Sequence, residues 1–144
     1  MNAMRPLEGI RILDLTQFVA GPLCTLTLCD LGAEVIKIER PGFGDDTRNE
    51  TPARNGTSAK FISCNRGKKS IELNLKDPRQ KKIFIHLVKK SDVVVENYKP
   101  GTMKKFGLDY EVLKEIKPDI IYAAISGFGQ TGPYSSRGAL DIAI

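Results

Sequence analysis

The chain has 144 residues and a net charge of +5, with 41% hydrophobic and 27% charged residues, the proportions of an ordinary globular domain. No apolar run has the length of a membrane span and no signal peptide is recognisable, so we expect a cytoplasmic protein without membrane contact. Three cysteines and a single histidine, His86, show no metal-ligand spacing, and the basic residues alternate with acidic ones among few aromatics, which disfavours metal and nucleic-acid binding.

The first third of the chain predicts a βαβ unit. Residues 10–16 and 34–39 are β-branched and aliphatic runs typical of strands, and residues 20–31 between them predict a helix with Gly32 at its C-cap. Leucines are spread around most of that helix, so we expect it to be buried rather than surface-lying. Two strands joined by one helix predict parallel pairing.

Residues 41–68 show no period and are rich in Gly, Pro, Asn and Thr, which predicts a long loop. Alternating apolar residues then predict a half-buried strand over residues 69–76. Asp77 and Pro78 are typical of a helix start, and the apolar stripe of that helix is formed by Ile83, Phe84, Leu87 and Val88. His86 falls on its polar face.

Three consecutive valines at 93–95 predict a strand buried on both faces, as in a parallel sheet. Helices are expected over residues 102–106 and 109–117, and a last strand over 119–126. Strands that alternate with helices indicate an α/β fold with a largely parallel sheet. The stretch Asn97, Tyr98 and Lys99 follows the valine strand at its carboxyl end, the edge where open α/β sheets usually bind ligands.

Arg40 follows the second strand and is expected at the same edge, where it could meet an anion together with Lys99. The turn of residues 16–22 precedes a helix whose first amides could hold a phosphate, although a plain strand–helix connection explains it equally well. Gly127, Gly129 and Gly132 match GxGxxG, but no helical period follows, so we interpret this match as a flexible loop.

Taken in order, several stretches resemble the N-terminal part of the class III coenzyme A transferases, the family of formyl-CoA transferase, carnitine dehydratase and the bile-acid-inducible CoA transferases. The matching stretches lie at residues 6–16, 20–22, 31–40, 65–71, 92–101 and 126–134. Each is weak alone, whereas the ordered series is specific.

The resemblance implies a Rossmann-like domain, with residues 1–144 as its CoA-binding portion, in an interlocked homodimer that moves CoA between carboxylic acids. The implied substrates are a CoA thioester and a small carboxylic acid, and the basic excess suits the phosphates of CoA. The resemblance also implies that these residues contact CoA: Val19, Ala20, Arg40, Leu73, Asn74, Leu75, Lys76, Asn97, Tyr98, Lys99, Lys105, Arg137, Gly138, Ala139 and Leu140.

In the family, an aspartate forms an anhydride and a thioester during the transfer. The resemblance places that residue beyond position 144, so we expect the chain to be a fragment that is inactive alone, and Asp141 is not the nucleophile. Leu140 stands where the racemase branch has a histidine base, which argues against a racemase. Two alternatives are a stand-alone α/β nucleotide-binding module without transfer chemistry and an unstable remnant that binds no ligand.

Overall fold

The structure, a computed structural model, describes residues 5–139. Within this range one sheet has five strands, and all of its neighbouring strands are parallel. The strands are β1 (Arg11–Asp14), β2 (Glu34–Glu39), β5 (Lys69–Glu72), β6 (Val93–Glu96) and β7 (Ile121–Ala124). The helices are α1 (Ala20–Asp30), α2 (Ala59–Asn65), α3 (Pro78–Val88), α4 (Thr102–Phe106) and α5 (Tyr110–Ile116).

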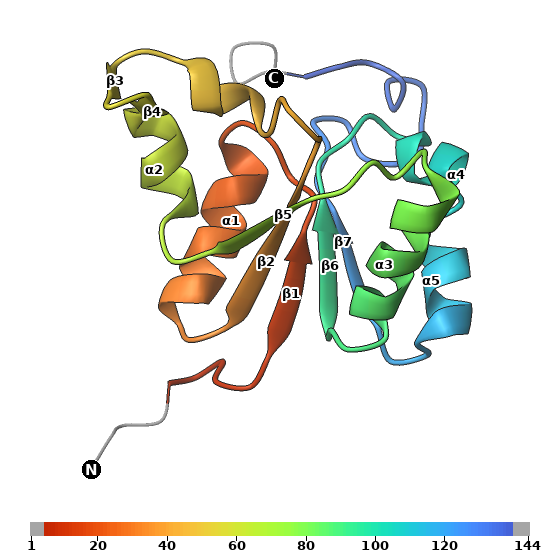
Figure 1. The fold of residues 1–144 in the computed structure, drawn as a ribbon. Helices are drawn as coiled ribbons and strands as arrows, with labels where there is room; N and C mark the ends of the chain where they lie inside the picture. The colour runs from red at the N-terminus through yellow and green to blue at the C-terminus, as the bar shows by residue number, and fades with distance from the viewer. Residues whose placement is uncertain (1–4, 140–144) are drawn as a thin grey trace.

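The strands lie in the order β5-β2-β1-β6-β7. The chain therefore builds outward from β1 in one direction through β2 and β5, and then returns to build outward in the other direction through β6 and β7 (Figure 1). This is the order of a doubly wound Rossmann-like sheet, with its topological switch between β1 and β6. The predicted α/β class with a largely parallel sheet is confirmed.

Helices cover both faces of the sheet (Figure 1). On the face of α3 and α5, Leu13, Phe84 and Leu113 belong to one buried cluster. On the face of α1, a smaller cluster contains Ile12 and Val35. Adjacent strand residues thus point into different clusters, because side chains alternate along a strand. The valine strand behaves as expected: Val94 packs in the first cluster and Val95 in the second.

The prediction of a structureless loop over residues 41–68 is wrong. This stretch contains a 3-10 helix η1 (Asp46–Asn49), a hairpin of β3 (Ala53–Arg54) and β4 (Thr57–Ser58), and α2. The hairpin turns at Asn55 and Gly56, which both have positive φ angles of 52° and 75°, the turn chemistry that Asn-Gly favours. The Ser58 side chain accepts a hydrogen bond from the Phe61 amide and caps α2.

Three smaller expectations also need correction. The strand predicted over 69–76 ends at Glu72, although Leu73 and Leu75 beyond it are buried as expected. Helix α1 is not buried all round, because Leu23 is 50% exposed, and Leu31 at its C-cap is 41% exposed. In α3, whose predicted Asp77 cap is confirmed, Phe84 and Val88 are buried but Ile83 is 47% exposed. Among the described helices, none combines the length and the apolar character that crossing a membrane requires.

Candidate functional site

The carboxyl ends of the strands meet at one edge of the sheet, and the loops that leave this edge carry most of the predicted site residues (Figure 1). The exit of β1 leads into the turn before α1, and the exit of β6 leads into residues 97–101. These two exits flank the topological switch, where open α/β sheets form their binding crevice.

A pocket of about 360 Å³ lies at this edge, between the exits of β2, β5 and β6 and helix α4. Six of the predicted residues line it: Arg40, Leu73, Asn74, Leu75, Lys76 and Tyr98. Leucines and the aromatic rings of Tyr98 and Phe106 form apolar walls, with the two rings packed edge to face at 6.4 Å between centroids. Arg40 and Lys76 add positive charge, a combination that suits a ligand with both an apolar part and phosphates.

The two charged residues at the exit of β2 have different surroundings. Arg40 is half exposed and forms an ion pair with Asp46 on the surface, so its guanidinium is accessible to an anion. Glu39 is buried and accepts two hydrogen bonds from Arg48, at 2.6 and 2.7 Å. Burial alone would raise the pKa of Glu39, but Arg48, Ser70 and the Asp45 amide outweigh it and lower the pKa to about 2.

At the exit of β6, the buried carboxylate of Glu96 lies beside the partly buried Tyr98. The Tyr98 amide donates to Glu96 Oε2 at 2.7 Å, and the Tyr122 hydroxyl donates to Oε1 at 3.3 Å. Burial raises the pKa of Glu96, and burial together with the neighbouring Glu96 raises the pKa of the Tyr98 phenol to about 12. The phenol therefore stays neutral at physiological pH and can serve as a hydrogen-bond donor.

Asn97 joins the two sides of the topological switch. Its Oδ1 accepts from the Gln17 amide and its Nδ2 donates to the Gln17 carbonyl, both at 2.8 Å. Because both polar ends of the Asn97 amide group are engaged, the side chain fastens the first turn to the exit of β6 instead of pointing freely into the pocket. Asn97 does not line the pocket at the exit of β2.

The other predicted contacts lie around this pocket rather than in it. Val19 is the N-cap residue of α1 and supplies no side-chain cap, and Ala20 is the first, exposed residue of that helix. Lys105 in α4 is exposed and also lies outside the pocket lining.

The stretch after β7 runs along the same edge (Figure 1). Gly138 lies against the Lys99 side chain, whose Cε would be 3.6 Å from a Cβ atom at position 138. Arg137 is exposed and covers the Tyr134 ring at 4.3 Å. Ala139 is half-buried, and Leu140 lies outside the described residues.

Sequence reasoning missed four residues that line the pocket: Ile38, Glu39, Pro41 and Phe106. The first three lie within two residues of Arg40 in the sequence. Their position at the exit of a strand that already supplied one candidate residue could therefore have indicated them. Phe106 ends α4, and the sequence places no recognisable ligand motif there. It reaches the pocket because its ring packs against Tyr98.

Outside the lining of this pocket, two lysines are buried with carboxylates. Lys68 Nζ lies 2.9 Å from Asp14 Oδ2 and also donates to the Pro22 carbonyl, the Thr25 hydroxyl and Asn65 Oδ1. Burial lowers the pKa of Lys68 although Asp14 opposes the shift. Lys37 Nζ similarly lies 2.9 Å from Asp45 Oδ2. All four side chains are at most 1% exposed.

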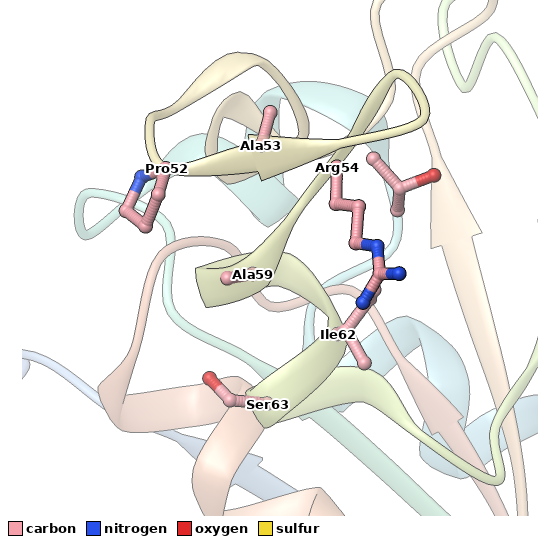
Figure 2. Close-up of a pocket in the computed structure, with 7 residues that line it drawn as sticks. Pro52, Ala53, Arg54, Ala59, Ile62 and Ser63 are labelled. Atoms are coloured by element: carbon pink, nitrogen blue, oxygen red, sulfur yellow. The ribbon is translucent and has the colours of Figure 1, made fainter.

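A second pocket, of about 370 Å³, lies between the β3–β4 hairpin and α2. Figure 2 shows Arg54 extending from the hairpin toward Ile62 of α2, and Ser63 one residue further along the helix. Arg54 is the single charged residue of its lining, and none of the predicted contacts lies there. The pocket at the carboxyl edge therefore fits a phosphate-bearing ligand better. Within residues 5–139, no three His, Cys, Asp or Glu side chains are grouped so that they could hold a metal ion.

Comparison with known proteins identifies the family of the chain. The family model described as CoA-transferase family III matches residues 7–144. Human succinyl-CoA:glutarate CoA-transferase is 56% identical over 142 residues, which are 98% of this chain and 32% of the human protein. The acetyl-CoA:oxalate CoA-transferase of Acetobacter aceti is 50% identical and aligns with 94% of this chain and 35% of its own length.

Solved structures agree with these sequence matches. The crystal structure of a CAIB/BAIF family protein from Brucella suis superposes with a TM-score of 0.91 at 46% identity, covering 96% of this chain and 38% of that one. A hypothetical protein from Mycobacterium tuberculosis superposes with a TM-score of 0.89 at 44% identity, with the same coverage. The chain spans about a third of the length of the curated relatives it matches. The fold, the pocket at the carboxyl edge and these matches together show that the chain belongs to CoA-transferase family III.

Proposed function

We propose that the chain is the CoA-holding portion of an acyl-CoA:carboxylate CoA-transferase. The observation that carries this proposal is the pocket at the carboxyl edge, in which Arg40 and Lys76 stand beside the apolar walls of Leu73, Leu75 and Phe106. Coenzyme A likewise has a charged part and an uncharged part, because the phosphates of its nucleotide are joined to an uncharged pantetheine arm. The membership in CoA-transferase family III supports CoA over other nucleotides.

In the proposed complex, Arg40 and Lys76 bind phosphate oxygens of CoA, and Tyr98 contributes an aromatic face and a neutral hydroxyl. Arg40 is well suited to this role because a guanidinium can donate two parallel hydrogen bonds to one phosphate. Asn97 acts through Gln17, since it holds the first turn against the exit of β6. The predicted contacts at Val19, Ala20, Lys99, Lys105, Arg137, Gly138, Ala139 and Leu140 complete the proposed site around this pocket.

The proposed reaction moves CoA from a thioester to a free carboxylic acid through an aspartyl anhydride and an aspartyl thioester. No aspartate in residues 1–144 is assigned the nucleophilic role, so this chain supplies binding and not the covalent step. The relatives are named for succinyl-CoA or acetyl-CoA paired with glutarate, oxalate or mesaconate, and a small carboxylic acid is accordingly the proposed acceptor. We further propose that the whole protein is a cytoplasmic homodimer.

Calorimetry with the 144-residue chain tests the proposal. CoA should bind, dephospho-CoA should bind more weakly because it lacks the 3′-phosphate, and NAD should bind weakest. Equal affinities for CoA and NAD would instead favour a stand-alone nucleotide-binding module. Acyl transfer by this chain above a control without protein would contradict the assignment of the nucleophile to another part of the protein.

A further inference from the structure

The turn between β1 and α1 contains a strained residue. Phe18 has a φ angle of 65°, in the left-handed region that is unfavourable for an L-residue with a bulky side chain. Its side chain is 42% exposed, so packing of the ring in a core does not explain why the backbone keeps this conformation. Contacts to the backbone on each side of Phe18 must hold it.

Asn97 holds the amide and the carbonyl of Gln17, and Lys37 and Asp45 supply further contacts from two other segments. Lys37 Nζ donates to the Thr16 carbonyl at 2.8 Å, and Asp45 Oδ1 accepts from the Phe18 amide at 3.3 Å. The ammonium of Lys37 and the Asp45 carboxylate lie 2.9 Å apart, with side chains 1% and 0% exposed. The pair therefore holds the Thr16 carbonyl, two residues before the strained Phe18, and the Phe18 amide at the same time.

Asp45 is itself held firmly in place. Its Oδ1 accepts from the amide and the hydroxyl of Thr47 at 2.9 and 2.8 Å, which caps η1. Burial would raise the pKa of Asp45, but Lys37 and the hydrogen bonds from Thr47 outweigh burial and lower it. The carboxylate thus stays charged, and the loop after β2 carries it to the turn after β1.

Stability alone is a weak reason for this arrangement. A buried ion pair can often be replaced by packed apolar residues without loss of stability, because desolvation of two charges offsets their attraction. Apolar residues at positions 37 and 45 could not satisfy the Thr16 carbonyl or the Phe18 amide. What the charged pair provides, beyond stability, is the conformation of the turn.

We propose that Lys37 and Asp45 are positioning residues, which hold the Thr16–Phe18 turn in its strained conformation so that the start of α1 presents its backbone to CoA. The inference rests on the proposed function, since Val19 and Ala20 directly follow this turn. Neither Lys37 nor Asp45 lines the pocket, so both act through the turn.

The test removes the pair without leaving a buried charge, as Lys37→Met/Asp45→Leu. We expect the free energy of unfolding to fall, because the Thr16 carbonyl and the Phe18 amide lose their partners. The CoA affinity should fall by about tenfold or more, and hydrogen exchange at the Phe18 amide should accelerate. Val88→Ala is the matched control: it removes buried volume from α3, far from the turn, and should lower stability while CoA affinity stays within about twofold.

The milder variant Thr47→Val covers the case in which the double variant does not fold. It removes one hydrogen bond from Asp45 Oδ1 and retains both charges, so the exchange of the Phe18 amide should accelerate without global unfolding. Unchanged exchange at the Phe18 amide in the variants, or CoA affinity equal to that of the original chain in Lys37→Met/Asp45→Leu, would overturn the proposal. If the unmodified chain binds no CoA, the proposed function fails, and the exchange measurement alone then decides whether the pair positions the turn.

Discussion

Two groups of cations occur near the carboxyl edge of the sheet. The sequence alone does not distinguish them, but the structure shows that one group is buried and the other lines the pocket. Lys37 and Lys68 are buried against carboxylates and fasten loops to the sheet. Arg40 and Lys76 line the pocket, and Arg40 is half exposed with a surface partner. The difference teaches that charge at a ligand edge is not by itself evidence of ligand binding, because a cation already committed to a buried carboxylate stabilises the loops that carry the accessible ones.

The largest effect is expected from a buried cation. Lys68→Met leaves the Asp14 carboxylate buried without its ammonium, which should lower the free energy of unfolding by about 3–5 kcal/mol. Urea denaturation measures this loss. Lys69→Met is the control, because the neighbouring side chain is 70% exposed and its ion pair with Glu34 should contribute at most about 1 kcal/mol. Equal losses of unfolding free energy in Lys68→Met and Lys69→Met would show that burial does not distinguish the contributions of these cations to stability.

For the accessible group, the effect should appear in binding and not in stability. Arg40→Gln is expected to weaken CoA binding about 10- to 100-fold, the cost of one charge-assisted contact to phosphate. Its stability should fall by no more than about 1 kcal/mol, since the Asp46 pair is exposed. Lys82→Gln, an exposed position of α3 outside the pocket lining, should change neither quantity. Calorimetry and urea denaturation of both variants measure these two quantities. A large loss of stability with unchanged CoA affinity in Arg40→Gln would show that Arg40 has a structural role instead.

The hydrogen bonds of Asn97, which connect the two sides of the topological switch, are expected to contribute less to stability than the Lys68–Asp14 pair and more than an exposed ion pair. Asn97→Ala removes both hydrogen bonds to Gln17, and we predict a loss of about 1–2 kcal/mol in the free energy of unfolding. Gln130→Ala, which loses one long hydrogen bond at an exposed position, serves as the comparison. A thermal melt in which the two variants coincide would show that the Asn97 bridge carries no stability.

The smallest effect concerns Glu96, the buried carboxylate whose described hydrogen-bond donors are the Tyr98 amide and the Tyr122 hydroxyl. Because burial raises its pKa from 4.5, its contribution to stability is fully present below 4.5 and is lost as pH rises through the raised value. Glu96→Gln removes the charge while keeping an oxygen for the Tyr98 amide. The stability of this variant relative to the unmodified chain should therefore increase as pH rises from about 4.5 through the raised pKa of Glu96, and then level off. A difference that does not vary with pH would show that Glu96 does not titrate in this range.

The sequence predicted the sheet and the order of its main helices, because regular apolar periods are local signals. Polar strand exits likewise indicated the edge at which the candidate pocket lies. Helix α2 was missed because seven residues after a hairpin show no clear period, although Asn55-Gly56 and the Ser58 cap were readable. The two buried lysines could not be found locally. Lys37 interrupts an apolar strand as a surface lysine would, and its burial depends on Asp45, which arrives from the following loop.

The loop between β2 and η1 has a consequence for engineering the chain. Gly44 has a φ angle of 66°, and a Cβ atom there would lie 2.6 Å from Arg48 Cδ and 2.8 Å from Glu39 Oε2. The length of this loop is also fixed, because Asp45 at its end must reach Lys37 in β2. Inserted residues or affinity tags belong instead at the exposed Asn55–Gly56 tip of the hairpin, where a Cβ atom at position 56 would meet nothing within 4 Å. Two loops that each contain a glycine with positive φ thus differ sharply in how much new sequence they can accept.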